Sequence, residues 1–459
     1  MKKKLLLAMA VLGAAAWQGA NAIVLKANDN EFANVGLNLQ IWAQNDGKVT
    51  STQQNSNNFI VNDALIYFSG QINPIVQFGA DFEFPVSPSP VPYHEGITYA
   101  RVSDAFINFK FMPEFQLMAG LFRDPVSRLT GTDSYTYVIP TGYGYGFDTV
   151  WGNIPIYTKT NTSTNQSTTV NLSDILNPFE TITIGDIDGM NPPRDAGIAI
   201  WGNVADTMLK YYLFAANGAY DYSAGYNTNS NLKYGIRVAF TPTMLGYKNS
   251  SGFGDQDTFL GALNNLTIDL GYEQQKLDCS GVNANNTALY YMCDQGNTSS
   301  LTPKYYNVDA IWEQKFGTFV PQIQLGWAEK QDLMATKYGN VKSTGYYVQI
   351  AALYDQMVGI GKPGIAFRWD YSKVDNYAYT TVTTNGSGTS NTTITSIPSA
   401  KINRYGIFLN YYIAGEAARI SLGADIVEPD SNLKNVSLPN GGGYLKNFTD
   451  WTLALQTEF

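Results

Sequence analysis

The feature that most constrains this chain is a repeated pattern of short segments in which apolar and polar residues alternate. Between Leu232 and Thr241, for example, every second residue is large and apolar, and Lys, Gly, Arg and Ala stand between them. A period of two predicts a β-strand with two chemically different faces. We count sixteen such segments, at residues 33–44, 63–71, 76–84, 101–110, 115–122, 196–202, 208–216, 232–241, 266–274, 305–314, 319–328, 345–354, 364–372, 403–412, 418–427 and 449–459.

The connections between these segments are mostly long and short in turn. The first connection, 45–62, is long and the second, 72–75, is short. Membrane barrels of the bacterial outer membrane have short periplasmic turns and longer extracellular loops, and an even strand count puts both termini in the periplasm. One connection departs from this rule. Residues 242–265 should form a short turn but number twenty-four, so either this is an elaborated turn or the count slips there.

The two faces of the segments carry opposite chemistry. One face is apolar, and the other holds Asn, Gln, Asp, Glu, Lys, Arg and Gly. Alternation alone would also suit a half-buried sheet in a soluble sandwich. The loop pattern favours instead a barrel whose apolar face meets lipid and whose polar face lines a water-filled lumen. We therefore predict an all-β fold, a transmembrane antiparallel β-barrel of sixteen strands, and expect the protein in the bacterial outer membrane.

The two ends of the chain point to export and membrane insertion. Residues 2–4 are lysines, residues 5–17 form a short apolar run, and Ala20-Asn21-Ala22 is a small-x-small cleavage site, so residues 1–22 read as a signal peptide. An amino-terminal anchor helix is disfavoured because the run is too short to span a bilayer. The last strand ends on Phe459, which resembles the signal read by the barrel-assembly machinery. The alternative, a soluble edge strand, is disfavoured because termini tend to fray.

Composition narrows the class further. Only 15% of the residues are charged, whereas about a quarter is usual in soluble proteins, and Tyr and Phe are abundant. The balance of 29 basic and 38 acidic residues argues against nucleic acid as a partner. Cys279 and Cys293 lie fourteen positions apart in one polar segment. In an exported protein we expect a loop disulfide, with two free thiols as the alternative. Residues 23–459 are predicted to form a single domain.

Two passages resemble the phosphate- and polyphosphate-selective porins, the O and P porins. The first runs from Val102 to Lys110 and on through Leu117 to Ser127, and resembles that family's "DAYIGYK…G-basic-x-P" passage. The second, from Arg194 through Lys210-Tyr211-Tyr212 to Gly218, resembles its "RDxGv…G…lkY…NG" passage. The resemblance implies a sixteen-stranded barrel, usually a homotrimer, whose third loop folds inward to narrow the pore.

The third loop corresponds to residues 123–195, the longest connection. Loops beyond about fifteen residues are usually functional or disordered. Its Tyr- and Gly-rich part, 131–147, could pack inside the barrel, and its Ser/Thr/Asn-rich part, 158–169, is expected outside. We expect a charged constriction formed by Arg123, Asp124, Arg128 and Asp133. The alternative is a mobile surface loop with incidental charges.

Strand alternation also predicts which charged residues face the lumen. The basic set is Lys210, Lys233, Arg237, Arg368, Arg404 and Arg419, and the acidic set includes Asp81, Glu83, Asp269, Glu273, Asp309 and Glu313. The arginines could form a sparse ladder for anions, which an anion pore requires. Because the acids outnumber the bases, we expect instead a porin for small hydrophilic solutes and ions that is non-selective or mildly cation-preferring. A transverse field between the two walls would orient dipolar solutes.

Other functions are less well supported by the sequence. A catalytic centre is not expected, because the single histidine, His94, lies in a Pro-rich segment predicted as a surface loop. Calcium binding at residues 185–189 lacks the full liganding spacing. We expect no cofactor and no metal. An adhesin or phage receptor built on the loops is compatible with a porin. The expected partners are outer-membrane lipids, small solutes and ions, and two further copies of the chain.

Overall fold

The structure of the chain is a computed structural model. The structure describes residues 23–84, 101–161, 166–170, 173–180, 194–218, 220–221, 226–227, 231–280, 287–294, 297–385, 389–438 and 442–459. The predicted signal peptide, His94 and residues 185–189 lie outside these ranges. Among the described residues no helix is long and apolar enough to cross a membrane.

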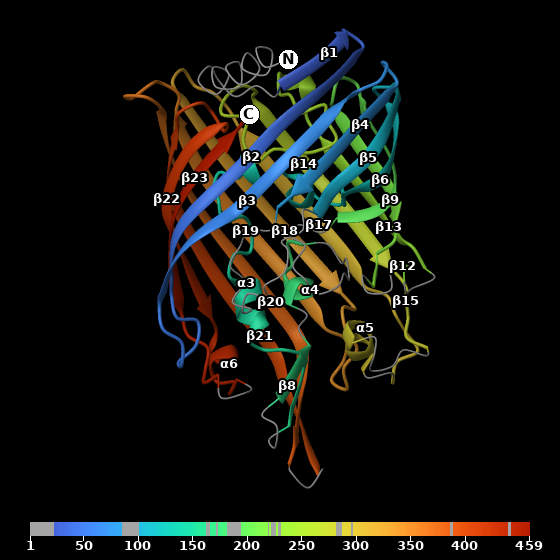
Figure 1. The fold of residues 1–459 in the computed structure, drawn as a ribbon, viewed down its shortest axis with the longest axis vertical. Coiled ribbons are helices and arrows are strands. Elements are labelled where there is room, and N and C mark those ends of the chain that lie inside the picture. Colours follow the sequence, from blue (N-terminus) through green and yellow to red (C-terminus); the bar gives the residue numbers. More distant parts are fainter. Residues whose placement is uncertain are drawn as a thin grey trace, which may run out of the picture.

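Sixteen antiparallel strands form one closed barrel (Figure 1). In chain order they are β2 (Glu31–Asp46), β3 (Ser56–Gln71), β4 (Val76–Glu83), β5 (Arg101–Met112), β6 (Phe115–Arg123), β9 (Arg194–Val204), β10 (Leu209–Ala216), β13 (Lys233–Phe240), β14 (Asn265–Gln275), β17 (Lys304–Glu313), β18 (Phe319–Gln331), β19 (Lys342–Tyr354), β20 (Lys362–Thr384), β21 (Ser390–Tyr412), β22 (Ala418–Pro429) and β23 (Phe448–Glu458). Each predicted segment corresponds to one of these strands, so the predicted fold class is confirmed.

The last strand closes the barrel. β23 pairs with β22 on one side and with β2 on the other, and Gln40 lies opposite Gln456 in that closing ladder. The Gln40 side chain also donates a hydrogen bond to Gln456, 3.1 Å away. Closure removes the free edges that a sheet cannot leave unpaired in hydrocarbon. The expected pairing of the first and last predicted strands is therefore confirmed.

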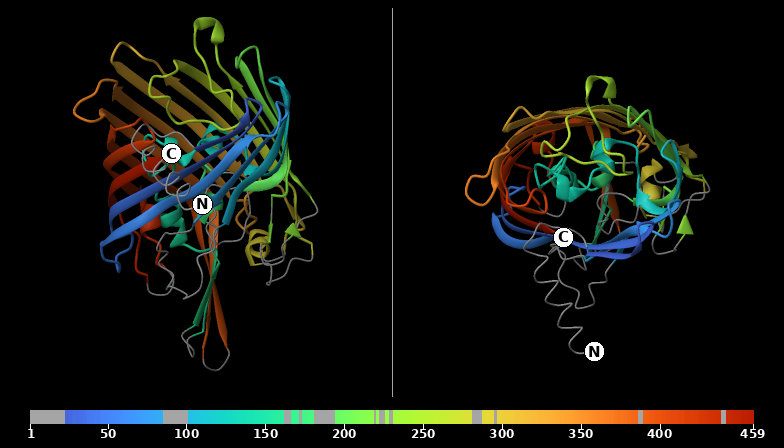
Figure 2. Two further views of the ribbon diagram at one scale, coloured as in Figure 1. Left: turned by 45° about the horizontal axis from the view of Figure 1, so that its top comes forward. Right: turned by 90° about the horizontal axis from the view of Figure 1, so that it is seen from above.

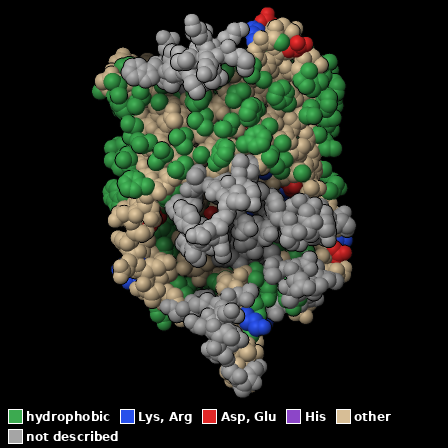
Figure 3. Space-filling view, viewed as in Figure 1, with side chains coloured by type: hydrophobic (Ala, Val, Ile, Leu, Met, Phe, Trp, Pro, Cys, Tyr) green, Lys and Arg blue, Asp and Glu red, His purple; other side chains and the backbone are tan. Residues whose placement is uncertain are grey.

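The outer surface is an apolar belt (Figure 3). Leu270, Ile350, Ile407, Leu409 and Leu422 point outward from their strands and are each more than half exposed. Aromatic side chains gather where strands meet the short turns, and this set comprises Phe111, Phe115, Phe316, Phe319 and Tyr354. Such a belt with an aromatic girdle at its rim is the surface that lipid requires.

Ile23, the first described residue, and Phe459 lie beside the start of β2 at one end of the barrel, and the longest loops lie at the other end (Figure 1). By the usual topology the end with the termini is periplasmic. There β1 (Ile23–Asn28) extends the wall by pairing with β2. The remaining short strands are β7 (Tyr157–Asn161), β8 (Gln166–Val170), β11 (Tyr220–Asp221), β12 (Tyr226–Asn227), β15 (Leu277–Asp278) and β16 (Ser300–Leu301). The helical elements are α2 (Arg128–Gly131), η1 (Ser134–Thr136), α3 (Phe147–Gly152), α4 (Ser173–Leu176), η2 (Thr243–Leu245), α5 (Thr287–Met292) and α6 (Ser431–Lys434).

Two expectations need correction. The predicted loop 373–402 continues as strand, because β20 and β21 stay paired from Lys362–Tyr412 out to Thr384–Ser390. At about 3.3 Å per residue, 23-residue strands are roughly twice as long as a spanning strand needs. The hairpin therefore projects from the extracellular end, where β7 pairs alongside β20 (Figure 1). Thr, Ser and Asn between few apolar residues hid this extension from the sequence pattern.

The second correction concerns the interior. The sequence pattern indicated a polar lumen, but much of the inner wall contacts an apolar core formed with the third loop. From the loop, Phe147, Val150 and Trp151 on α3 are fully buried. From the wall, Val374 and Val427 belong to the same cluster. These wall residues lie toward the extracellular end of strands whose other inward positions are charged. The interior of the barrel is therefore apolar near the extracellular end and polar closer to the periplasmic end.

Candidate functional site: the barrel lumen

The third loop follows β6, and the part of it that the structure describes directly after β6, residues 124–161, enters the barrel (Figure 2). Its first helical turn, α2, begins with a capping box in which Ser127 and Thr130 exchange hydrogen bonds. The wall makes room for this turn, since a Cβ added at Gly271 on β14 would lie 1.8 Å from the Val126 carbonyl oxygen. The Tyr- and Gly-rich residues 131–147 follow inside the barrel. This part of the loop therefore lies within the ring of strands, where inward side chains of the wall bind it.

The four constriction candidates divide into three ion pairs. Arg123 pairs with Asp133 at 3.0 Å and donates to the Thr132 carbonyl at 2.7 Å. Arg128 instead reaches Asp309 on β17, at 3.0 Å. Asp124 pairs with Lys233 on β13. The structure thus joins Arg123 to Asp133 within the loop, and uses Arg128 and Asp124 to attach the loop to the wall.

The inward arginines of β20 to β22 hold the loop from the opposite side. Arg368 and Arg404 both donate to the Gly142 carbonyl, at 2.5 and 2.7 Å. Arg419 donates to the Tyr137 carbonyl at 2.6 Å. Arg404 also pairs with Asp370 and with Asp425, the latter at 2.6 Å. All three guanidinium groups are buried against the loop. In the predicted arginine ladder they would instead be exposed to passing anions.

The basic residues on β10 and β13 are also buried in ion pairs. Lys210 lies 3.8 Å from Asp255, and Arg237 lies 2.5 Å from both Asp255 and Asp269. Lys233 lies 3.0 Å from Asp195 and 4.0 Å from Glu273. Each of the six predicted basic residues therefore lies within 4.0 Å of a carboxylate or donates to a carbonyl of the third loop.

Four of the six predicted acids belong to this buried network. Asp269, Glu273 and Asp309 lie beside the cations just named, and all are inaccessible to solvent. Glu313 is buried as well and accepts a hydrogen bond of 2.7 Å from Thr258. The other two, Asp81 and Glu83, are only half-buried. They therefore differ in setting from the rest of the predicted acidic set.

A second segment inside the lumen was not predicted. Residues 242–264 connect β13 to β14 at the periplasmic end, and we call them the inner turn. The first part of this yellow-green segment projects beyond the ring of strands, where Met244 and Leu245 are exposed, and the part that follows lies inside the ring next to the third loop (Figure 2). Its Asp255 and Asp257 are buried at 4% and 0% exposure. The unusual length of 242–265 was the available signal, and it marks an elaborated turn.

Asp257 makes the most contacts within the inner turn. Its carboxylate accepts from the Val138 amide at 2.8 Å, from Gln324 at 3.1 Å and from the Tyr143 hydroxyl. Burial alone would raise the pKa of Asp257, but Arg368, Arg128 and these hydrogen bonds hold it below its ordinary value. Asp257 is therefore a buried carboxylate stabilised in its charged form.

Half-buried inward residues border the part of the lumen that the third loop and the inner turn leave unfilled. On β3 and β4 these are Asp63, Asp81 and Glu83, and on β23 Glu458. The third loop faces them with Ser134, whose hydroxyl lies 3.3 Å from Asp63. Two cations join this group, each in an ion pair: Arg123 with Asp133, and Arg194 with Asp104 at 3.0 Å. We call Asp63, Asp81, Glu83 and Glu458 the acidic wall.

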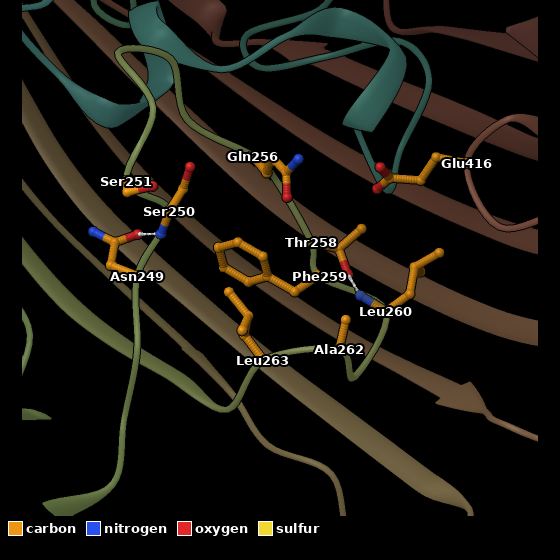
Figure 4. A pocket seen from close by; sticks show the side chains of 10 residues that line it. All are labelled: Asn249, Ser250, Ser251, Gln256, Thr258, Phe259, Leu260, Ala262, Leu263 and Glu416. Atoms are coloured by element: carbon orange, nitrogen blue, oxygen red, sulfur yellow. Dashed lines mark hydrogen bonds between the residues drawn. The ribbon is translucent and has the colours of Figure 1, made fainter. Parts of the chain in front are cut away.

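The periplasmic mouth is hollowed beside the inner turn. A cavity of about 450 Å³ is lined by one side of that turn, including Gln256, Thr258 and Phe259, and by Glu416 across from it (Figure 4). Glu416 belongs to the turn between β21 and β22. The inner turn thus fills the periplasmic mouth only in part.

Other predicted features lie away from the lumen charges. Cys279 and Cys293 form a disulfide, with their Cα atoms 5.8 Å apart, and both are buried in the extracellular part. In the part of the chain that the structure describes, no three His, Cys, Asp or Glu side chains gather as a metal site would need.

Comparison with known proteins identifies the fold. No family model matches the sequence, and no curated relative matches it. Among solved structures, the chain is similar to Salmonella typhi OmpF in complex with daunomycin, at 15% identity over 95% of this chain and 100% of that one, with a TM-score of 0.50. The chain is also similar to the high-pH structure of Pseudomonas putida OprB, at 9% identity over 93% of this chain and 94% of that one, with a TM-score of 0.50. An anion-selective porin of Comamonas acidovorans gives 12% over 93% and 100%, at 0.48.

The fold is therefore that of the outer-membrane porins. At these identities the likeness concerns the fold. The closed barrel and the apolar belt require a lipid bilayer, and barrels of this kind belong to the bacterial outer membrane. The chain is a porin-fold protein of the bacterial outer membrane.

Proposed function

We propose that this chain forms a water-filled channel through which small hydrophilic solutes and ions diffuse passively. Barrels of sixteen strands are wide enough to leave an aqueous channel. The third loop and the inner turn fill the lumen along β9 to β22, whereas side chains along β3, β4 and the end of β23 stay partly exposed. These partly exposed side chains support a passage beside the acidic wall.

The proposed channel prefers cations. This preference is supported by the difference in exposure between the basic and the acidic residues of the lumen. The six predicted basic residues are buried against carboxylates or loop carbonyls. The partly exposed wall holds Asp63, Asp81, Glu83 and Glu458. A ring or wall of carboxylates favours cations because it replaces part of their hydration with negative potential.

The phosphate-selective function that the family resemblance implied is the alternative. An anion filter needs cationic side chains that can reach the solute. Arg368 and Arg404, the best candidates for such a ladder, are each 0% exposed and bind the Gly142 carbonyl. The described lumen therefore supports this alternative less well than a cation-preferring pore.

Neutralising the acidic wall tests the proposal. We expect the double variant D81N/E83Q to lower the cation-to-anion permeability ratio about five-fold, because each of the two unit charges, about 8 Å from an ion in water, contributes about 0.5 kcal/mol. The ratio is measured as the reversal potential of single channels in a potassium chloride gradient. D355N is the matched control, because Asp355 is a periplasmic carboxylate paired with Lys362 outside the lumen. An unchanged ratio in D81N/E83Q would contradict the proposal.

A closed barrel serving as an adhesin or receptor remains the second alternative. Liposomes that contain the protein should swell in solutions of small sugars, and the swelling should decline with sugar size. A closed barrel would give no swelling with any sugar. This readout is independent of charge, so it separates the channel from its ion preference.

The assembly proposed is a homotrimer, as the family resemblance implies, inserted by the barrel-assembly machinery through the strand that ends at Phe459. Residues 1–22 are proposed to be removed on export. Chemical cross-linking in outer-membrane fractions should give a ladder ending at three copies. Sequencing of the amino terminus should begin at Ile23.

A further inference from the structure

The inner turn and the third loop form one body across the lumen. They are joined by backbone hydrogen bonds, since the Asp255 amide donates to the Gly131 carbonyl at 2.9 Å and Thr132 and Asp255 form a parallel β-bridge. The Asp257 amide also donates to the Thr136 hydroxyl at 3.0 Å. The two segments come from opposite ends of the barrel, so each limits how far the other can move.

The inner turn is itself attached to the wall. The Asp257 carbonyl accepts from Gln322 at 2.7 Å and from Gln324 at 2.8 Å, both on β18. The Glu313 carboxylate accepts from the Phe259 amide at 3.1 Å and the Gly261 amide at 2.8 Å. With Arg237 on Asp255, these contacts connect the turn to β13, β17 and β18. The turn is therefore a fixed support for the third loop.

Asp257 is where the support meets the loop. Its carboxylate binds the Val138 amide and the Tyr143 hydroxyl, which lie at two ends of the stretch that forms the inner face of the third loop. Between these two residues, the Gly142 carbonyl accepts hydrogen bonds from Arg368 on β20 and Arg404 on β21. Arg128 and Arg368 lie 3.7 and 3.8 Å from the same carboxylate. Removing this one carboxylate would remove the hydrogen bonds to Val138 and Tyr143, and it would leave Arg128 and Arg368 without this partner.

We propose that the inner turn sets the cross-section of the pore, with Asp257 as the positioning residue that fixes residues 137–143 of the third loop against β18 to β22. This inference rests on the proposed channel function. It assigns to a periplasmic turn a part of the constriction that the third loop alone would otherwise form. Solutes would then be selected by size through a two-part constriction, supported from both sides of the membrane.

The test compares D257A, D257N and the control D355A in liposomes and planar bilayers. We expect D257A to admit larger uncharged sugars and to give larger, more fluctuating single-channel conductance. D257N keeps the volume but loses the charge and one acceptor, so it should lie between D257A and the unaltered protein. D355A should match the unaltered protein, because Asp355 lies on a turn outside the lumen.

A second readout does not depend on conduction. A cysteine at Val138, which is 4% exposed, should react slowly with a water-soluble maleimide in V138C and several-fold faster in V138C/D257A. Heat-modified mobility in gels checks that each barrel is folded. If the unaltered protein conducts and D257A changes neither the sugar limit nor the labelling rate, the inference is wrong while the channel stands. If the unaltered protein does not conduct, the proposed function fails, and the labelling alone still decides whether Asp257 holds the loop.

Discussion

At the scale of single residues, the lumen shows how the same side chain can be read in two ways. Strand alternation predicted that Arg404 faces inward, because inward and outward positions alternate along a regular paired strand. It could not show that a loop more than two hundred residues earlier would reach Arg404 through the Gly142 carbonyl. The direction in which a strand side chain points depends on its own strand. Its accessibility depends also on distant segments that enter the barrel.

Arg404 gives a residue-scale prediction. R404A would leave Asp370 and Asp425 buried without their shared cation, and breaking a buried pair from one side costs about 3–5 kcal/mol. We therefore expect R404A to lower the free energy of unfolding in urea, with little change in anion permeability. The triple variant R404A/D370N/D425N should recover part of the loss. A fully stable R404A with reduced anion permeability would instead support the phosphate-selective alternative.

At the scale of elements, the barrel strands were predictable and the segments inside it were not. Sixteen strands have a periodic signal because each must present one face to lipid. The inner turn has no such signal. Its residues satisfy their polar groups against a wall that exists only once the barrel has closed, and Asp257 meets partners from β18, β19 and the third loop. Only its length marked it as exceptional.

The inner turn also gives a prediction of pH dependence. The pKa values of Asp255 and Asp257 are lowered because, despite burial, Arg237 with Lys210 and Arg368 with Arg128 stabilise the carboxylates. A lowered pKa contributes stability above the ordinary value of 3.8 that is lost as the pH falls through the folded value. The size limit for uncharged sugars should therefore stay constant from about pH 7 to about pH 5 and rise only below 3.8. A rise between pH 7 and pH 5 would show that other groups hold the turn.

At the scale of the whole molecule, the lumen has two different sides. One part of the lumen, along β9 to β22, contains the third loop, the inner turn and the buried ion pairs. The other part, along β3 and β4, keeps its carboxylates partly exposed. This chain, which has more acids than bases, thus uses its lumen cations to bind the third loop and the inner turn, and in the proposed function the partly exposed acids line the passage. The transverse field expected from the sequence needs free cations on the opposite wall, which the buried arginines do not supply.

The reversal potential of the unaltered protein tests this account most directly. Purified protein is inserted into a planar bilayer with potassium chloride at ten-fold different concentrations on the two sides. We predict open channels whose reversal potential has the sign expected when potassium permeates faster than chloride. A reversal potential of the opposite sign, or a barrel that inserts and does not conduct, would contradict it.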